Sequence, residues 1–165
     1  MSVYRFEDLR VWQAAKEQCD RVGELRKRPE FAQGHELSDQ MNRASISVMF
    51  NISEGFLRRR DGETAQCLRY AFASNGEVKC GYYAAQGRKY IGADEAAQLI
   101  ELNEKIARML RRWQATLDDE GARRDKRRTG GTKDRGVTKD RGRTKDGGPR
   151  TDQGPRTDEA PRPKD

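Results

Sequence analysis

Arginine side chains gather at two places in the chain, and their spacing could bind phosphate groups. Arg58, Arg59 and Arg60 are adjacent. A guanidinium group presents its N–H donors as a planar fork, so it can hold a phosphate through two hydrogen bonds, with an affinity that falls as the salt concentration rises. A run of charge is also typical of a solvated polar loop. These three residues are therefore a candidate contact for nucleic acid, with the solvated loop as the alternative.

Three more arginines form the second group. Arg108, Arg111 and Arg112 lie near the end of a predicted helix, and they are a further candidate contact for nucleic acid. The carbonyl end of a helix carries the negative end of its macrodipole, where cations are stabilising. This position favours a structural role for the second group over phosphate contact.

Five other polar side chains fall on or beside the apolar faces of predicted helices, and they could form a buried network or a contact between subunits. They are Gln40, Arg43, Asn51, Glu54 and Glu77. An unpaired buried polar group costs about 1–3 kcal/mol, so any buried member must find a partner. Glu77 is a candidate partner for the other four. We therefore expect substitutions here to damage folding or assembly first.

No motif of a catalytic or metal site occurs in the sequence. His35 is the only histidine, which excludes a pair of histidines for acid–base chemistry or a pair of Glu-x-x-His metal motifs. There is no Gly-rich phosphate loop, nucleophile elbow or Cys-x-x-Cys pair. We therefore expect no enzymatic activity, no bound metal and no cofactor, with His35 in a turn.

The cysteines and the apolar segments predict the cellular location. Cys19, Cys67 and Cys80 are odd in number and widely spaced, as is typical of reduced thiols in a helical core. The first twelve residues lack the apolar core of a signal peptide, and no stretch approaches the roughly 18 apolar residues of a membrane span. The sequence predicts a cytoplasmic protein that does not cross a membrane.

Four amphipathic segments must position these side chains. Apolar residues recur at steps of three and four over about 9–27, 36–55, 61–89 and 95–117. The connections between the segments are short, which favours antiparallel neighbours. The second segment has an unusually broad apolar face, because Ile46, Met49 and Phe50 widen its main stripe; this predicts contact with another helix or another subunit. The fold class predicted is all-α, an antiparallel up-down-up-down four-helix bundle over residues 1–120.

The remaining residues, 121–165, have a different composition. Residues 1–120 contain 19 of the 34 Lys and Arg residues and 19 of the 27 Asp and Glu residues, so 121–165 carry the whole net charge of +7. The tripeptide Thr-Lys-Asp recurs in them at six-residue spacing, among Gly and Pro. With almost nothing to bury, such a segment cannot offset the entropy of ordering. We predict a disordered, basic, low-complexity tail, which either collects RNA or only aids solubility.

Two motifs carry a resemblance to a known family. Residues 6–13, Phe-Glu-Asp-Leu-Arg-Val-Trp-Gln, and residues 51–55, Asn-Ile-Ser-Glu-Gly, resemble the proteins encoded in intervening sequences of bacterial 23S ribosomal RNA genes. Ser74, Glu77 and Tyr90 fall where the later part of the family pattern expects them. The chain departs from that pattern at Ser53, where Ala is usual, and at Lys89, where Gly usually precedes the tyrosine.

The resemblance implies partners as well as a fold. Relatives include accessory variability determinant proteins of diversity-generating retroelements, which form rings of five subunits and bind nucleic acid and a reverse transcriptase. It therefore implies RNA binding and a homo-oligomer, here a homopentamer, with a reverse transcriptase as a further partner. Our first hypothesis is a non-catalytic RNA-binding bundle whose salt-dependent affinity falls when residues 121–165 are removed. The alternative is a protein-interaction scaffold that recruits a partner through the broad face of the second helix.

Overall fold

The chain is all-α in the part that the structure describes. The computed structural model describes residues 4–32, 34–58 and 60–130, and in the last range it describes side chains as far as residue 127. These ranges contain a 3-10 turn and five α-helices, four of them long, and they contain no strand. In chain order the elements are η1 Phe6–Asp8, α1 Arg10–Arg26, α2 Pro29–Ala32, α3 His35–Leu57, α4 Asp61–Gly87 and α5 Ala93–Gly130.

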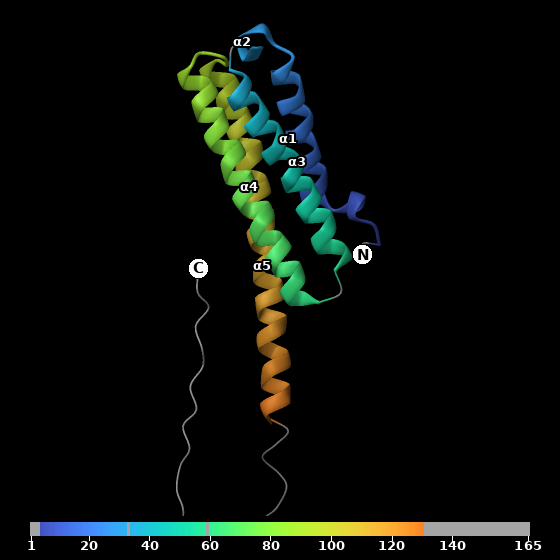
Figure 1. The fold of residues 1–165 in the computed structure, drawn as a ribbon. Helices are drawn as coiled ribbons and strands as arrows, with labels where there is room; N and C mark the ends of the chain where they lie inside the picture. The colour runs from blue at the N-terminus through green and yellow to red at the C-terminus, as the bar shows by residue number, and fades with distance from the viewer. Residues whose placement is uncertain (1–3, 33, 59, 131–165) are drawn as a thin grey trace, which may run out of the picture. The chain divides into compact units, whose positions relative to one another are not determined.

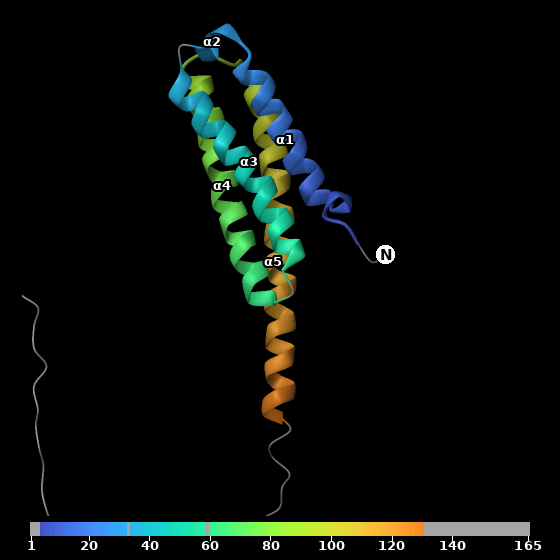
Figure 2. The same ribbon diagram turned by 45° about the vertical axis from the view of Figure 1, so that its right-hand side comes forward.

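The four long helices pack side by side as a helical bundle. α3 lies between α1 and α4, and α5 packs against both α4 and α1 (Figures 1 and 2). The side chains at the centres of the predicted apolar stripes are buried, with Val48, Ile52 and Ile106 at 0% exposure. No helix of the described residues combines the length and the apolar composition that a membrane span requires.

The core has two hydrophobic parts separated by a polar layer. One part, near α2, includes Phe31, Met41 and Tyr82. The other, toward the start of α1, includes Val11 and Ile52. Between the two, three amide side chains are buried and bonded to one another: Gln18 from α1, Asn75 from α4 and Asn103 from α5. The bundle is therefore held by apolar burial at both ends and by hydrogen bonds between them.

The connection between α1 and α3 contains a helical turn that the sequence pattern did not predict. Pro29 begins α2, because the first helical position needs no N–H donor. Phe31 is 2% exposed, and its ring centre lies 5.3 Å from that of Tyr90. Gly34 allows this approach, since an added Cβ would lie 2.6 Å from the Tyr90 ring. The connection is thus packed against the bundle.

The end of α4 holds Lys89 in a conformation that favours glycine. Lys89 has a φ of 61°, the left-handed conformation that glycine adopts without strain. Its N–H donates to the Gln86 carbonyl at 2.9 Å, and the Tyr90 N–H donates to the Ala85 carbonyl at 2.9 Å. The bond from Tyr90 to Ala85 spans five residues, and it satisfies a carbonyl that the helix end would otherwise leave free. Lys89 therefore occupies a glycine position.

The last helix continues past the boundary predicted at residue 120. α5 runs to Gly130, so the segment 121–130 is helical. Arg124 forms an ion pair with Asp61 at the start of α4, which anchors this extension to its neighbour. Residues 131–165, on which most of the predicted disordered tail and its Thr-Lys-Asp repeats fall, lie outside the described residues.

Candidate nucleic-acid interface

The first arginine group lies at the turn between α3 and α4 and is partly neutralised. Arg58 donates to Glu54, and this hydrogen bond raises the pKa of Arg58. The same guanidinium lies 3.5 Å from Glu63, and that of Arg60 lies 3.7 Å from it. Arg59 lies outside the described residues. Arg60 is more open to solvent than Arg58, with 84% of its side chain exposed against 48%.

The second arginine group lies in the middle of a helix and not near its end, where stabilisation by the helix dipole was expected. α5 ends at Gly130, and the helix dipole acts only within the last turn, so it does not account for Arg108, Arg111 or Arg112. Arg108 is 4.0 Å from Glu104, and the Arg111 guanidinium lies over the Phe72 ring, 4.9 Å from its centre. The sequence could not reveal this last contact because the two residues belong to different helices.

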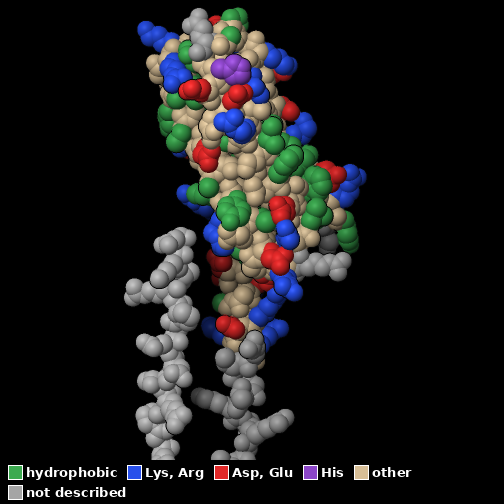
Figure 3. Space-filling model, in the orientation of Figure 1, with side chains coloured by type: hydrophobic (Ala, Val, Ile, Leu, Met, Phe, Trp, Pro, Cys, Tyr) green, Lys and Arg blue, Asp and Glu red, His purple; other side chains and the backbone are tan. Residues whose placement is uncertain are grey.

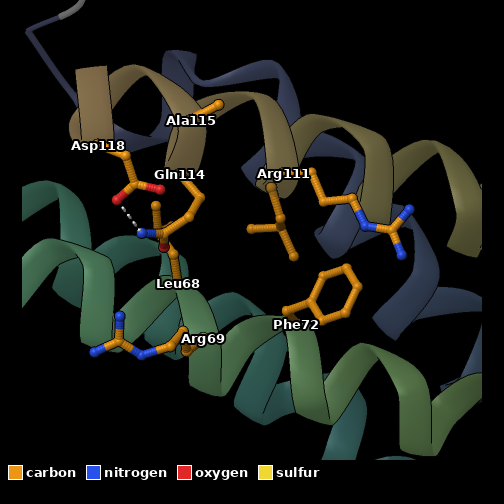
Figure 4. Close-up of a pocket in the computed structure, with 8 residues that line it drawn as sticks. Leu68, Arg69, Phe72, Arg111, Gln114, Ala115 and Asp118 are labelled. Carbon is orange, nitrogen blue, oxygen red and sulfur yellow. Dashed lines mark hydrogen bonds between the residues drawn. The ribbon is translucent and has the colours of Figure 1, made fainter. Parts of the chain in front are cut away.

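A groove runs between α4 and α5 beside Arg111. Leu68, Phe72 and Leu110 line a hollow of about 360 Å³. Figure 4 shows Arg111 reaching from α5 over Phe72, while Arg69 extends along α4 away from that ring. Arg69 was not among the sequence candidates, although its position three residues before Phe72 on one helix could have indicated it.

The Gln114 side chain also lines this hollow. Its Nε2 donates to Asp118 at 3.2 Å. Its Oε1 is buried, and no described residue donates a hydrogen bond to it. Asp118 therefore has a hydrogen-bond donor from its own helix.

The groove continues on the other side of Phe72. Gly76, Lys79, Ala107 and Arg108 help to line a second hollow of about 420 Å³. Lys79 Nζ donates to Glu104 at 2.8 Å. This hydrogen bond raises the pKa of Lys79 and lowers the pKa of Glu104, so both groups stay charged at neutral pH.

The two hollows together carry a positive charge. Four basic side chains line them, namely Arg69, Lys79, Arg108 and Arg111. The two acidic side chains there are Glu104 and Asp118, which pair with Lys79 and Gln114. The surface around these two hollows, called the α4–α5 face below, is therefore basic. Over residues 1–120 as a whole, the numbers of acidic and basic side chains are equal. Local charge of this kind attracts anions even when the net charge is zero.

The predicted polar network lies at the surface, along the seam between α3 and α4. Gln40 Nε2 donates to Glu77 at 2.6 Å, and Arg43 donates to Gln40 at 3.0 Å. Asn51 is half-buried and donates to the backbone carbonyl of Ser47 at 2.8 Å. The expected pairing exists, but its helix positions face solvent. The buried polar network in the core is instead formed by the amides of Gln18, Asn75 and Asn103.

Beside this seam, α3 exposes apolar side chains. Phe50 and Leu57 are 67% and 68% exposed, and Ile46 and Met49 are half-buried. Figure 3 shows hydrophobic side chains gathered on this face of the molecule, over α1 and α3. The broad face predicted for the second helix is therefore only partly covered by neighbouring helices.

The histidine and the cysteines differ in part from expectation. His35 is the first residue of α3, with its Nδ1 3.2 Å from Asp39 Oδ2, and does not lie in a turn. The three thiols are free. Cys67 is buried, which raises the pKa of its thiol, and Cys19 is half-buried. Cys80 is exposed, so the expectation of a core position is wrong for it, because it falls on the outer side of α4.

Comparison with known proteins identifies the family. A search of proteins with curated functions finds no match. The family described as 23S rRNA-intervening sequence protein matches residues 7–112. This match spans the beginning of the helical bundle through the second arginine group on α5. The chain therefore belongs to the family of 23S rRNA-intervening sequence proteins.

Proposed function

We propose that this chain is a non-catalytic RNA-binding protein, and that the α4–α5 face is its main contact on the bundle. The observation that carries the proposal is the excess of basic side chains along that face. Arg108 and Arg111 lie there, far from the end of α5, so the helix dipole does not explain their positions. The segment 121–130 extends the same helix and adds five basic side chains against one acidic.

The proposal includes the antiparallel up-down-up-down topology of the four-helix bundle. Contacts between neighbouring helices support it, since residue numbers rise along one helix as they fall along the next. Gln18 of α1 bonds Asn103 of α5, and Arg28, just after α1, bonds Glu95 nearer the start of α5. This arrangement places α4 beside α5, where it completes the basic groove.

Crosslinking to cellular RNA tests the proposal. We expect purified full-length protein to capture RNA above a neutral helical bundle. The variant Arg108→Gln/Arg111→Gln/Arg112→Gln should capture less than the variant Arg10→Gln/Arg21→Gln/Arg88→Gln, which removes equal charge from other exposed positions. Equal capture by the two variants would remove the α4–α5 face from the proposal, and no capture above the neutral bundle would refute RNA binding.

A second candidate function is favoured by the exposed apolar side chains of α3. Phe50 and Leu57 would be covered in a homo-oligomer or against a partner protein, such as a reverse transcriptase. Light scattering coupled to size exclusion measures the assembly; a homopentamer has five times the mass of the chain. We expect Phe50→Ser/Leu57→Ser to dissociate it, whereas Tyr83→Ser, which alters an exposed aromatic residue on α4, should not. A monomeric wild-type protein would leave the partner protein as the candidate occupant.

A further inference from the structure

The groove between α4 and α5 combines positive charge with a surface suited to stacking. Phe72 is half-buried and borders both hollows of the groove. The guanidinium of Arg111 lies 4.9 Å from the centre of its ring (Figure 4). A planar cation held over an aromatic face offers flat surfaces on which a further ring can stack. Binding to phosphates alone requires no such surface.

The two hollows are large enough for flat rings. Their volumes of about 360 and 420 Å³ lie in the lower part of the range typical of small-ligand sites, roughly 300–1,000 Å³. Leu68 and Leu110 give the first hollow an apolar floor. The second is bordered by Gly76, beside which there is open space, because an added Cβ would meet nothing within 4 Å. An unpaired base could therefore enter on either side of Phe72.

Cations stand on both sides of this stacking surface. Arg69 lines the first hollow and hydrogen-bonds the neutral amide of Gln66. Arg108 lines the second, 4.0 Å from Glu104, whose shorter bond is to Lys79. Arg69 is thus bonded to an uncharged group and Arg108 shares Glu104 with the closer Lys79, so both guanidinium groups can turn to a phosphate.

We propose that the groove binds unpaired nucleotides of RNA, with a base stacked against the Phe72–Arg111 pair and phosphates held by Arg69 and Arg108. This inference rests on the proposed RNA binding and adds that the bound strand is single. In a duplex the base faces are covered by stacking, whereas unpaired bases expose them to aromatic and arginine planes. An acidic peptide is attracted by the same charges but gains no stacking.

The test compares single-stranded with double-stranded RNA on the full-length chain. Fluorescence anisotropy measures the affinity for a short labelled oligouridine and for a blunt-ended RNA duplex, which has no unpaired nucleotides. Phe72→Leu removes the ring, and Arg111→Lys keeps the charge but removes the plane. We expect each to weaken oligouridine binding about tenfold and leave duplex binding unchanged. Tyr4→Leu and Arg88→Lys are the matched controls at exposed positions, and they should leave both affinities unchanged.

Two measurements keep the outcome clear if Phe72→Leu unfolds. Arg111 is exposed, so Arg111→Lys leaves the core intact. Its effect on oligouridine affinity then decides whether the groove stacks a base. Oligouridine carrying 4-thiouridine should crosslink to peptides that contain Phe72 or Arg111. Crosslinks only to residues 121–165, or equal binding by wild type and both variants, would overturn the groove while RNA binding stands. Oligoglutamate that competes as well as unlabelled oligouridine would also overturn it, whereas failure to bind any RNA would refute the proposed function itself.

Discussion

Asn75 and Asn103 bond each other reciprocally across the interface of α4 and α5. Asn75 Nδ2 donates to the Asn103 backbone carbonyl at 3.0 Å, and Asn103 Nδ2 donates to the Asn75 backbone carbonyl at 2.7 Å. Gln18 of α1 closes the layer, since it donates to Asn75 Oδ1 and accepts from Asn103 Nδ2, both at 3.1 Å. Sliding any one helix by a turn would leave buried amides unpaired, so this layer contributes to the register of three helices.

Removing one member of the layer should destabilise the bundle. Asn103→Ala leaves Gln18 and Asn75 with unsatisfied groups at nearly complete burial, and we expect a loss of about 2–4 kcal/mol in the free energy of unfolding. Urea denaturation measures it. The combined variant Gln18→Met/Asn75→Leu/Asn103→Leu removes all three amides together and should lose less than Asn103→Ala. If the triple variant were less stable than Asn103→Ala, the hydrogen bonds of the layer would themselves stabilise the bundle, in addition to leaving no buried group unpaired.

Two glycines of α4 should respond oppositely to alanine. At Gly81 an added Cβ would lie 2.3 Å from Met41 Cγ of α3, so Gly81→Ala should destabilise by about 1–3 kcal/mol. At Gly76 the added Cβ has open space, and Gly76→Ala should stabilise by about 0.5–1 kcal/mol through helix propensity. Thermal unfolding of the two variants checks both signs. If Gly81→Ala were as stable as the wild type, Met41 would have room to move.

Glycine at residue 89 should stabilise the end of α4. Lys89 holds the left-handed conformation at a cost that glycine avoids, so Lys89→Gly should gain about 0.5–1 kcal/mol even after the greater freedom of glycine in the unfolded chain is included. Chemical denaturation measures the gain. Lys89→Ala removes the charge but keeps the Cβ, and it should show no such gain.

The ion pair of Arg28 with Glu95 should make stability depend on acid pH. Arg28 donates to both carboxylate oxygens, at 2.9 and 2.6 Å, and these bonds lower the pKa of Glu95. A lowered folded pKa means that the contribution is present above the unfolded pKa, about 4.3, and is lost as pH falls through the folded pKa. Because both side chains are more than a third exposed, we expect Glu95→Gln to cost only about 0.5 kcal/mol at pH 7.

Unfolding curves from pH 7 downward check this dependence. The stability difference between wild type and Glu95→Gln should shrink toward zero below the folded pKa. Glu101→Gln, at an exposed position of the same helix, is the matched control for the loss of one acidic side chain. A constant difference for Glu95→Gln across pH would assign its effect to packing.

Two truncations separate the end of α5 from the residues that follow. Ending the chain after Gly130 removes ten basic and seven acidic residues, whereas ending it after Glu120 removes the full excess of +7. We expect the second truncation to reduce RNA affinity and its salt dependence much more than the first. Anisotropy over a salt series measures both quantities. Equal behaviour of the full-length and both truncated proteins would exclude 121–165 from binding.

The helical elements and their inward faces follow from the sequence alone. Apolar residues at steps of three and four predict that Val48 and Ile52 face inward, and both are buried. The motif at 51–55 and the opening at 6–13 predict the family, which the match over residues 7–112 confirms. These features are local, because helix periodicity and short motifs depend on near neighbours in the chain.

The sequence predicted the end of the last helix and the exposed side chains of α3 less accurately. Charge composition led to a boundary at residue 120, but helix propensity among Arg and Lys and the contact with Asp61 carry α5 to Gly130. The polar residues near the apolar face of α3 were expected either in a buried network or in a contact between subunits. The structure places that network at the α3–α4 seam, because a helix position near the edge of a stripe can face either solvent or a neighbour.

Only the tertiary structure decided which distant side chains meet. The spacing of Asn75 and Asn103 within their own helices places each on an inward face, but their pairing depends on how far α4 and α5 are displaced along one another. The contact of Arg111 with Phe72 depends on the same displacement. Periodicity specifies the angle of a residue around its helix, whereas the register between helices is set by the packing of all their side chains together.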